Sequence, residues 1–274
     1  MNAIGIGPLA FAGDRFSVIA SLVVFLAVGS LVSTRVDRRL GGWTTTAALS
    51  GVFGARAVHV LTHFESFAWE PWRIPAIWQG GFSWLGGLLG VAFATAVLWR
   101  KAPRAAPWAA ISLGAGLFTW VVATSLVSGT AAPRAPDAPY AALNRRETIS
   151  IAKRSGRPAV LNLWASWCPP CRREMPILAD MARSNPHVDF LFANQGEGKE
   201  VVAAYLRQTG IDLDIILLDH FAELSRHYGA FGLPATLFIN PDGALVTSHL
   251  GEISREVLTE KMATLSPQDR TRTE

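Results

Sequence analysis

The hydrophobic residues of this chain are concentrated in its first half, in four long runs. These lie at about Phe16–Val32, Trp43–Leu61, Phe82–Trp99 and Trp108–Val127. Each run approaches the roughly 20 residues that a helix needs to cross a bilayer. A cleaved signal peptide is the alternative for the first run, but it lacks a basic leader and three more runs follow. The pattern therefore predicts a helical membrane domain, with about four transmembrane helices, over residues 1–128.

The second half has short apolar runs that alternate with helical spacing. It follows a segment rich in Pro and Ala, residues 129–139, which we expect to be a linker. Strands are predicted at 158–165, 187–194, 214–219, 235–240 and 244–250. Helices are predicted at 147–156, 169–184, 199–210, 220–232 and 255–265. The order predicts an α/β domain with a mixed sheet over 140–266, and 267–274 should form a polar tail.

The charges divide near the same boundary. Residues 1–138 carry 10 Lys or Arg and 5 Asp or Glu, whereas residues 139–274 carry 15 and 16. Two short loops between the apolar runs are basic, with Arg35, Arg38 and Arg39 in one and Arg100, Lys101 and Arg104 in the other. Basic short loops stay in the cytoplasm, so both termini should lie outside it. The excess charge thus fits a membrane topology, and we predict no binding to nucleic acid.

The sequence contains two cysteines, Cys168 and Cys171, within LNLWASWCPPCRREMP. A structural metal site usually needs four ligands, and none of the six histidines is spaced to complete one with this pair. We therefore predict no metal site. A purely structural disulfide across two intervening residues would constrain little of the unfolded chain. A redox-active disulfide that needs no other cofactor is the interpretation we favour.

The position of the pair supports this interpretation. Cys168 is expected between a strand and a helix, where unpaired N–H groups and the helix dipole stabilise a thiolate. A thiolate is the attacking species in disulfide exchange. Cys168 is therefore the predicted nucleophile, and Cys171, nearly one turn later, is the predicted resolving thiol.

Two motifs, VLNLWASWCPPCRREMP and YGAFGLPATLFINPDG, resemble the TlpA/ResA-like branch of membrane-anchored thioredoxin-fold thiol-disulfide oxidoreductases. The resemblance covers about Ala138–Leu265. It implies that the α/β domain has a thioredoxin-like fold with an extra central βα unit, which residues 187–210 would supply.

The same resemblance implies roles for residues near the cysteines. Pro234 matches a cis-proline beside the active site, where the backbone of Leu233 could pair with an extended substrate. Glu174 matches an acidic position that could raise the thiol pKa or pass protons. For Trp164 and Trp167 the sequence leaves two functions open, core packing and a substrate-facing surface. Arg172 and Arg173 are expected to be solvated helix charges.

A second resemblance lies in Gly51–Val91, where GAR and WQGGFSWLGGLLG are similar to the N-terminal part of prolipoprotein diacylglyceryl transferases. The family pattern has a histidine where this chain has Leu85, and an acid where it has Gln79. The later helices of the family do not follow, so we expect no transferase activity. Spacings of three and four residues place Arg56, His59 and His63 on one helix face. They could form a lipid or partner site, or remain from the ancestral fold with Arg56 satisfied by neighbouring carbonyls.

Together these features predict a multi-pass protein of a bacterial inner membrane with its C-terminal domain in the periplasm. It would reduce disulfides in exported proteins. Because the apolar runs contain no cysteine, its electrons should come from another membrane protein, and the resemblance suggests one like DsbD or CcdA. A thiol oxidase or isomerase is the first alternative. The others are a lipid-binding or lipid-modifying membrane protein with an accessory redox domain, and an interaction module whose thiols are idle.

Overall fold

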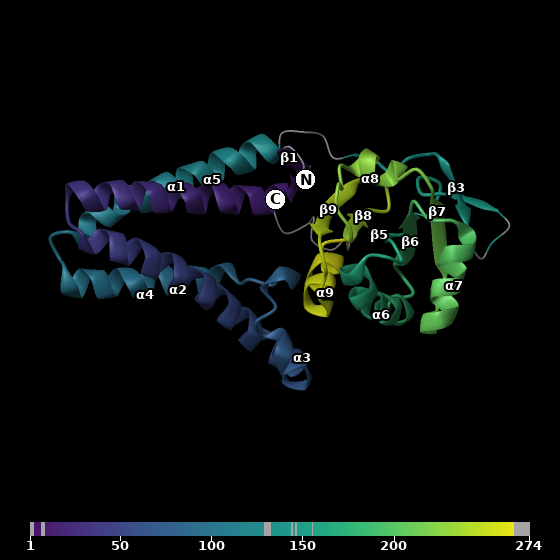
Figure 1. Cartoon of the computed structure of the whole chain (residues 1–274), viewed down its shortest axis with the longest axis horizontal. Helices are drawn as coiled ribbons and strands as arrows, with labels where there is room; N and C mark the ends of the chain where they lie inside the picture. Colours follow the sequence, from purple (N-terminus) through teal and green to yellow (C-terminus); the bar gives the residue numbers. More distant parts are fainter. Residues whose placement is uncertain are drawn as a thin grey trace. The chain divides into compact units, whose positions relative to one another are not determined.

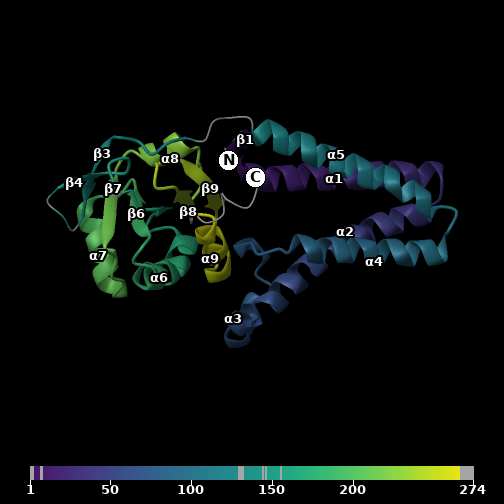
Figure 2. The same ribbon diagram turned by 180° about the vertical axis from the view of Figure 1, so that it is seen from behind.

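The computed structural model describes residues 3–6, 9–128, 133–143, 145, 147–154 and 156–265. The chain forms two compact units, Gly13–Gly129 and Thr130–Glu274, and residues 1–12 group with the second unit. The predicted polar tail, 267–274, lies outside the described residues. Figure 1 shows the helical unit and the α/β unit, and Figure 2 shows both from behind.

The four apolar runs form the four long helices of the first unit. They are α1 (Gly13–Arg35), α2 (Arg39–Thr62), α4 (Trp84–Lys101) and α5 (Ala109–Ser128). Short helices lie in the loops, namely α3 (Phe64–Trp69), η1 (Pro71–Arg73), η2 (Ile77–Gln79) and η3 (Ala106–Trp108). Helix α1 packs against α5 and α2 packs against α4, as both views show.

Two segments of this unit have the length and apolar composition of a membrane span. They are Phe16–Arg35, within α1, and Ala106–Leu126, which includes most of α5. The other two predicted spans are present as the helices α2 and α4, but within the described residues they do not meet the same criteria.

Glycines allow α2 and α4 to touch along their backbones. A Cβ atom added at Gly54 would lie 2.4 Å from the carbonyl oxygen of Gly86, and one added at Gly90 would lie 2.0 Å from that of Ser50. No other residue type fits at these distances, and close approach through small residues is typical of helices that pack in a membrane.

The second unit is built on a seven-stranded mixed sheet. The strands are β3 (Pro139–Ala142), β4 (Thr148–Ser150), β5 (Ala159–Trp164), β6 (Asp189–Gln195), β7 (Ile215–Asp219), β8 (Ala235–Ile239) and β9 (Leu245–Leu250). Their order is β4-β3-β7-β6-β5-β8-β9, in which β5, β6 and β7 are parallel and the other pairs are antiparallel. A separate hairpin joins β1 (Ala3–Ile6) to β2 (Leu9–Ala12).

Helices cover both faces of this sheet. They are α6 (Pro169–Ser184), α7 (Lys199–Thr209), α8 (Glu223–Tyr228) and α9 (Arg255–Ala263). Side chains of α6, α7 and α9 share one hydrophobic cluster with Val160 of β5, whereas α8 joins a second cluster that contains Leu161. Because both faces are covered, every residue of β5 is buried. In this thioredoxin-like arrangement, the strand and helix predicted over 187–210 are present as β6 and α7, and α7 leads into β7 at the side of β6.

The predicted helix over 147–156 is wrong. Residues 148–150 form β4, which pairs antiparallel with β3, and a turn follows. Thr148 and Ile149 are β-branched and fit a pleated surface better than a helix, and pairing with residues 139–141 outweighs the helical spacing of the segment.

The predicted linker also differs from the structure. Of residues 129–139, the described part begins at Pro133 and is bound to the α/β unit. The Leu245 N–H donates to the Pro133 carbonyl at 3.1 Å and the Ala135 N–H to the Gly243 carbonyl at 2.7 Å. Arg134 forms an isolated β-bridge with Ala244. Proline removes a donor but leaves a carbonyl that can still accept, so a Pro-rich segment can lie along a sheet edge.

Candidate functional site

Cys168 and Cys171 are joined by a disulfide at the N-terminus of α6, with their Cα atoms 5.3 Å apart. Cys168 is the N-cap residue, and its Sγ accepts a hydrogen bond from the Cys171 N–H at 3.3 Å. Pro169 and Pro170 occupy the first turn of the helix, where an N–H has no intrahelical partner and proline is tolerated. The Cys168 sulfur therefore lies at the positive end of the helix dipole, which stabilises a thiolate once the disulfide is reduced.

The two tryptophans beside the pair have different environments. Trp164, the last residue of β5, is fully buried, and its ring lies 5.5 Å from that of Tyr205. Trp167 is 67% exposed and immediately precedes Cys168. Of the two functions left open by the sequence, core packing therefore applies to Trp164, and Trp167 presents an apolar surface next to the disulfide.

Glu174, one turn after Cys171 on α6, is fully buried. Its Oε1 accepts a hydrogen bond from Nδ2 of Asn162 at 2.8 Å, and its Oε2 accepts one from the Ile253 N–H at 2.9 Å. Asn162 also donates to the Thr236 hydroxyl at 3.1 Å. The buried acid is thus held by β5 and by the segment before α9.

Burial raises the pKa of Glu174 to about 8, because the ionised form loses its hydration. The two hydrogen bonds oppose this shift, and the nearby Glu252 adds to it. The carboxyl is therefore mostly protonated at pH 7 and exchanges a proton in the range where general acid–base chemistry is efficient. Of the two effects expected of this residue, the environment favours proton transfer over like-charge repulsion.

Pro234 follows a cis peptide bond from Leu233, as the resemblance implied. Pro234 is buried, and its carbonyl accepts a hydrogen bond from the Gly251 N–H at 2.8 Å. This bond fixes the start of β8 against the end of β9.

Glu197 contacts the loop before Cys168, which sequence reasoning did not anticipate. Its Oε2 accepts hydrogen bonds from the Ser166 N–H and from Nδ2 of Asn194, both at 2.7 Å. The Ser166 hydroxyl donates to the other carboxylate oxygen. Glu197 lies 31 residues from Ser166 along the chain, so no local sequence pattern indicates the contact. Glu197 fixes the segment that positions Cys168 at the start of α6.

Arg173 is exposed, as expected of a solvated helix charge, and it also forms an ion pair. Its Nε and Nη2 donate to Oε2 of Glu252 at 2.9 and 2.6 Å. The guanidinium of Arg172 lies 5.8 Å from the centre of the Tyr205 ring. Because Glu252 precedes Ile253, the Arg173 ion pair ties α6 to the same segment that binds the Glu174 carboxyl.

In the helical unit, the buried Arg56 is satisfied by backbone carbonyls. Its guanidinium donates to Arg73 and Gly80, each at 2.8 Å, and to Ile74 at 2.9 Å, with further bonds to Gly81 and Ala76. The rings of His59 and His63 lie 4.5 Å apart. Of the two interpretations of this face, the bonds of Arg56 match the one in which neighbouring carbonyls hold the charge.

Two family models match the chain in succession. The Redoxin model matches residues 129–264, and the prolipoprotein diacylglyceryl transferase model, LGT, matches residues 10–127. The thiol-disulfide oxidoreductase ResA of Bacillus subtilis is 27% identical over 121 residues, which are 43% of this chain and 67% of ResA. The thiol:disulfide interchange protein DsbE of Escherichia coli K12 is 28% identical over 110 residues, 40% of this chain and 58% of DsbE.

A solved structure of a secreted Mycobacterium tuberculosis disulfide oxidoreductase is 25% identical, with a TM-score of 0.42, over 47% of this chain and 96% of that one. By the two family models and the two relatives, the chain carries in its C-terminal half a Redoxin domain of the ResA and DsbE thiol-disulfide oxidoreductase type, and its N-terminal part matches the prolipoprotein diacylglyceryl transferase family.

Proposed function

We propose that this chain is a membrane-anchored reductase of disulfides in exported proteins, with its Redoxin domain on the periplasmic side of a bacterial inner membrane. The observation that carries the proposal is the Cys168–Cys171 pair at the N-terminus of α6, one turn before a buried carboxyl whose pKa is about 8. The pair needs no bound cofactor, because its two sulfurs hold the two electrons.

In the reduced protein, the Cys168 thiolate attacks one sulfur of the substrate disulfide. A mixed disulfide forms, and the other substrate sulfur leaves as a thiolate that takes a proton. Cys171 then loses its proton and attacks the Cys168 sulfur, which releases the second substrate thiol. The substrate gains two electrons and two protons, and the Cys168–Cys171 disulfide is restored. Glu174, in its ionised form, is the acceptor for the Cys171 proton.

The surface around the pair supports a role in binding a polypeptide. Trp167 offers an exposed apolar contact beside Cys168. The cis bond before Pro234 ends the loop that carries the backbone of Leu233. An extended substrate segment paired with that backbone would bring its own sulfur next to Cys168, in the manner of an added strand.

The burial of the resolving thiol supports the reductase direction in this proposal. Cys171 is 0% exposed, and burial in an apolar environment disfavours a charged thiolate. A disulfide is a strong oxidant when its reduced form is stabilised, for example when positive charge stabilises the thiolate. Burial of Cys171 acts in the opposite sense and supports a reductant.

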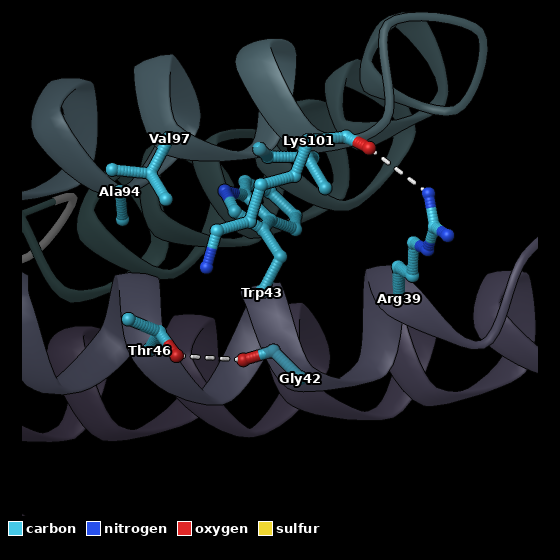
Figure 3. Close-up of a pocket in the computed structure, with 8 residues that line it drawn as sticks. Arg39, Gly42, Trp43, Thr46, Ala94, Val97 and Lys101 are labelled. Carbon is cyan, nitrogen blue, oxygen red and sulfur yellow. Dashed lines mark hydrogen bonds between the residues drawn. The ribbon is translucent and has the colours of Figure 1, made fainter.

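The helical unit is proposed to cross the membrane four times. Large apolar side chains are exposed on its helices, namely Phe53 of α2, Phe93 of α4 and Phe118 of α5, at 70, 70 and 69%. Such exposure suits the hydrocarbon core of a bilayer better than water. The two basic loops meet at one end of the unit, because Nη1 of Arg39 donates to the Lys101 carbonyl at 2.9 Å (Figure 3). Basic loops on one side indicate that this end lies in the cytoplasm.

An outside electron donor is part of the proposal. Both cysteines of the sequence lie in the Redoxin domain, so α1, α2, α4 and α5 cannot relay electrons by dithiol exchange. A membrane protein like DsbD or CcdA would reduce the Cys168–Cys171 disulfide after each cycle.

The direction is tested by alkylation of free thiols in growing cells, followed by a gel-shift assay of the full chain. We expect a mostly reduced pair that becomes oxidised when the membrane donor is deleted. A pair that stays oxidised with or without the donor would instead identify a thiol oxidase.

The substrates are tested with a Cys171→Ser variant, which should retain a mixed disulfide between Cys168 and its client. Mass spectrometry of the trapped species names the client, and the Cys168→Ser, Cys171→Ser double variant is the matched control. Failure to trap any exported protein above this control contradicts the proposed reaction.

A further inference from the structure

Arg172 lies in the first turn of α6, directly after Cys171. Its N–H donates to the Cys168 carbonyl at 3.1 Å, which closes the first hydrogen-bonded turn. Residues four apart on a helix lie on the same face, so the side chains of Cys168 and Arg172 are neighbours. The N-terminus of a helix carries partial positive charge and favours anions over cations. Arg172 therefore holds a position where helix stability alone disfavours a positive charge.

The two arginines of this turn have different partners. Arg173 pairs with Glu252. In the part of the chain that the structure describes, no carboxylate pairs with Arg172. The Arg172 guanidinium instead lies 5.8 Å from the centre of the Tyr205 ring, a distance at which a cation and an aromatic face attract. The charge of Arg172 is therefore held beside the dithiol without being neutralised by an acid.

Tyr205 is a fixed support for this side chain. It lies on α7 and is 8% exposed, and its ring is 5.5 Å from that of the fully buried Trp164. Trp164 ends β5, four residues before the nucleophile. Burial raises the pKa of Tyr205, and the nearby charge of Arg172 opposes that shift. The βα unit formed by β6 and α7 thus contributes an aromatic ring to the surroundings of the dithiol.

We infer that Tyr205 is a positioning residue for the redox reaction, which holds the guanidinium of Arg172 beside Cys168, where its charge stabilises the attacking thiolate. A positive charge near a cysteine favours the ionised form of the thiol. Without the ring, the Arg172 side chain would extend into solvent, where water and salt weaken its effect. The inference rests on the proposed function in taking Cys168 as the nucleophile, but not on the direction of electron flow.

The other charged groups around the nucleophile oppose Arg172 or are already compensated. The Glu197 carboxylate is bound to the loop before the nucleophile, and its negative charge disfavours a thiolate. Glu252 is paired with Arg173. The buried carboxyl of Glu174 has a pKa of about 8 and is mostly protonated at pH 7. Among these described groups, Arg172 is the cation without an ion pair, so its charge is the one that can support the thiolate.

The pH profile of Cys168 alkylation tests the inference. It is measured on the reduced full chain with Cys171→Ser, so that Cys168 is the one thiol. Arg172→Gln should raise the midpoint of the profile by about 0.5 pH units, which slows alkylation about threefold below the midpoint. The rates should converge above the midpoint, where the thiol is fully ionised. High salt should reduce the difference between the two proteins, because the charge is exposed to solvent.

Substitutions at Tyr205 test the positioning role. Tyr205→Met and Tyr205→Leu remove the ring and fill the site differently, so either one that folds is sufficient. Each should give part of the shift that Arg172→Gln gives, and neither should add to it in a double variant. Tyr205→Phe keeps the ring and should leave the midpoint in place.

The matched control is Arg207→Gln, which removes the same charge from an exposed site in the last turn of α7. It should leave the midpoint unchanged. Equal shifts for Arg172→Gln and Arg207→Gln would overturn the inference in favour of net charge. An unchanged midpoint without the Tyr205 ring would also overturn it, as would a shift in the double variant equal to the sum of the single shifts. Failure of the proposed function is a separate result, because a chain with both cysteines would then exchange with no disulfide while its alkylation profile could still be measured.

Discussion

The fully buried carboxyl of Glu174 makes the free energy of unfolding depend on pH. The pKa of this group is about 8 in the folded protein, against 4.5 for the ordinary value. Between these pH values the folded state keeps the proton and the unfolded state releases it. The free energy of unfolding therefore falls as the pH rises from about 4.5 to about 8, and it levels off above this window.

We predict that Glu174→Gln removes most of this slope, because an amide does not titrate. The amide of Asn162, whose Oδ1 has no partner among the described residues, can turn to accept from the new side chain. The difference between the proteins should reach several kcal/mol over the window. Brief proteolysis of the oxidised full chain in increasing urea, at pH 5, 6, 7 and 8, measures it. Glu200→Gln, an exposed site on α7, is the control. Parallel slopes for wild type and Glu174→Gln would contradict the prediction.

Glu197 is a positioning residue for the nucleophile, since it acts through the loop that precedes Cys168. We predict that Glu197→Ala destabilises the domain by about 1–3 kcal/mol, because it leaves the Ser166 N–H and the Asn194 amide without their acceptor. It should also shift the pH profile of Cys168 alkylation, measured with iodoacetamide on the reduced Cys171→Ser protein.

A merely structural loss would lower stability and leave that profile in place. Glu197→Gln keeps one acceptor oxygen, so it should restore much of the wild-type profile. An unchanged profile in Glu197→Ala would exclude the positioning role.

At the residue scale, the sequence predicts site residues that lie close to one another along the chain. It does not predict contacts between segments that are far apart in the chain. Cys171 and Glu174 lie on one predicted helix and Cys168 immediately precedes it, so their spacing alone places them together. The contact of Glu197 with Ser166 and that of Glu252 with Arg173 join segments 31 and 79 residues apart. No periodicity encodes such pairs, because they depend on the order of strands in the sheet.

At the element scale, α6 was predictable from end to end. Its apolar positions have helical spacing, the prolines fall in the first turn, and Cys168 provides an N-cap acceptor. Residues 148–150 were not predictable in the same way. Their conformation is decided by pairing with β3, and β3 itself lies partly in the segment expected to be a linker. Short edge strands depend on their neighbours more than on their own composition.

The contact between α2 and α4 makes a prediction at this scale. Gly90→Ala places a methyl group where only 2.0 Å separates it from the Ser50 carbonyl oxygen, so the helices must move apart. We expect a lower midpoint for thermal aggregation in detergent. The matched control is Gly114→Ala in α5, where an added Cβ meets nothing within 4 Å. That change should be neutral or should stabilise the helix by up to about 1 kcal/mol. Equal effects of the two substitutions would show that the close approach is unimportant.

At the scale of the whole molecule, the proposed topology predicts which sites a membrane-impermeant maleimide can reach in intact cells. In a chain without Cys168 and Cys171, Trp72→Cys and Asp242→Cys should be labelled, because both lie outside the cytoplasm in this topology. Arg104→Cys, in a basic loop, should be labelled only after the cells are opened. All three positions are exposed in the structure. Labelling of Arg104→Cys in intact cells would reverse the orientation and with it the proposed periplasmic function.

The edge of the sheet also determines how the redox half can be separated from its anchor. Residues 133–135 are hydrogen-bonded to 243–245, across the turn between β8 and β9. The sequence alone would place the start of the domain at Tyr140. A fragment that begins there lacks this strand-like segment and exposes the edge of the β8–β9 hairpin to other molecules. Cutting ahead of Pro133 keeps it, and should yield the soluble, monomeric material that crystallisation or titration of the thiols requires.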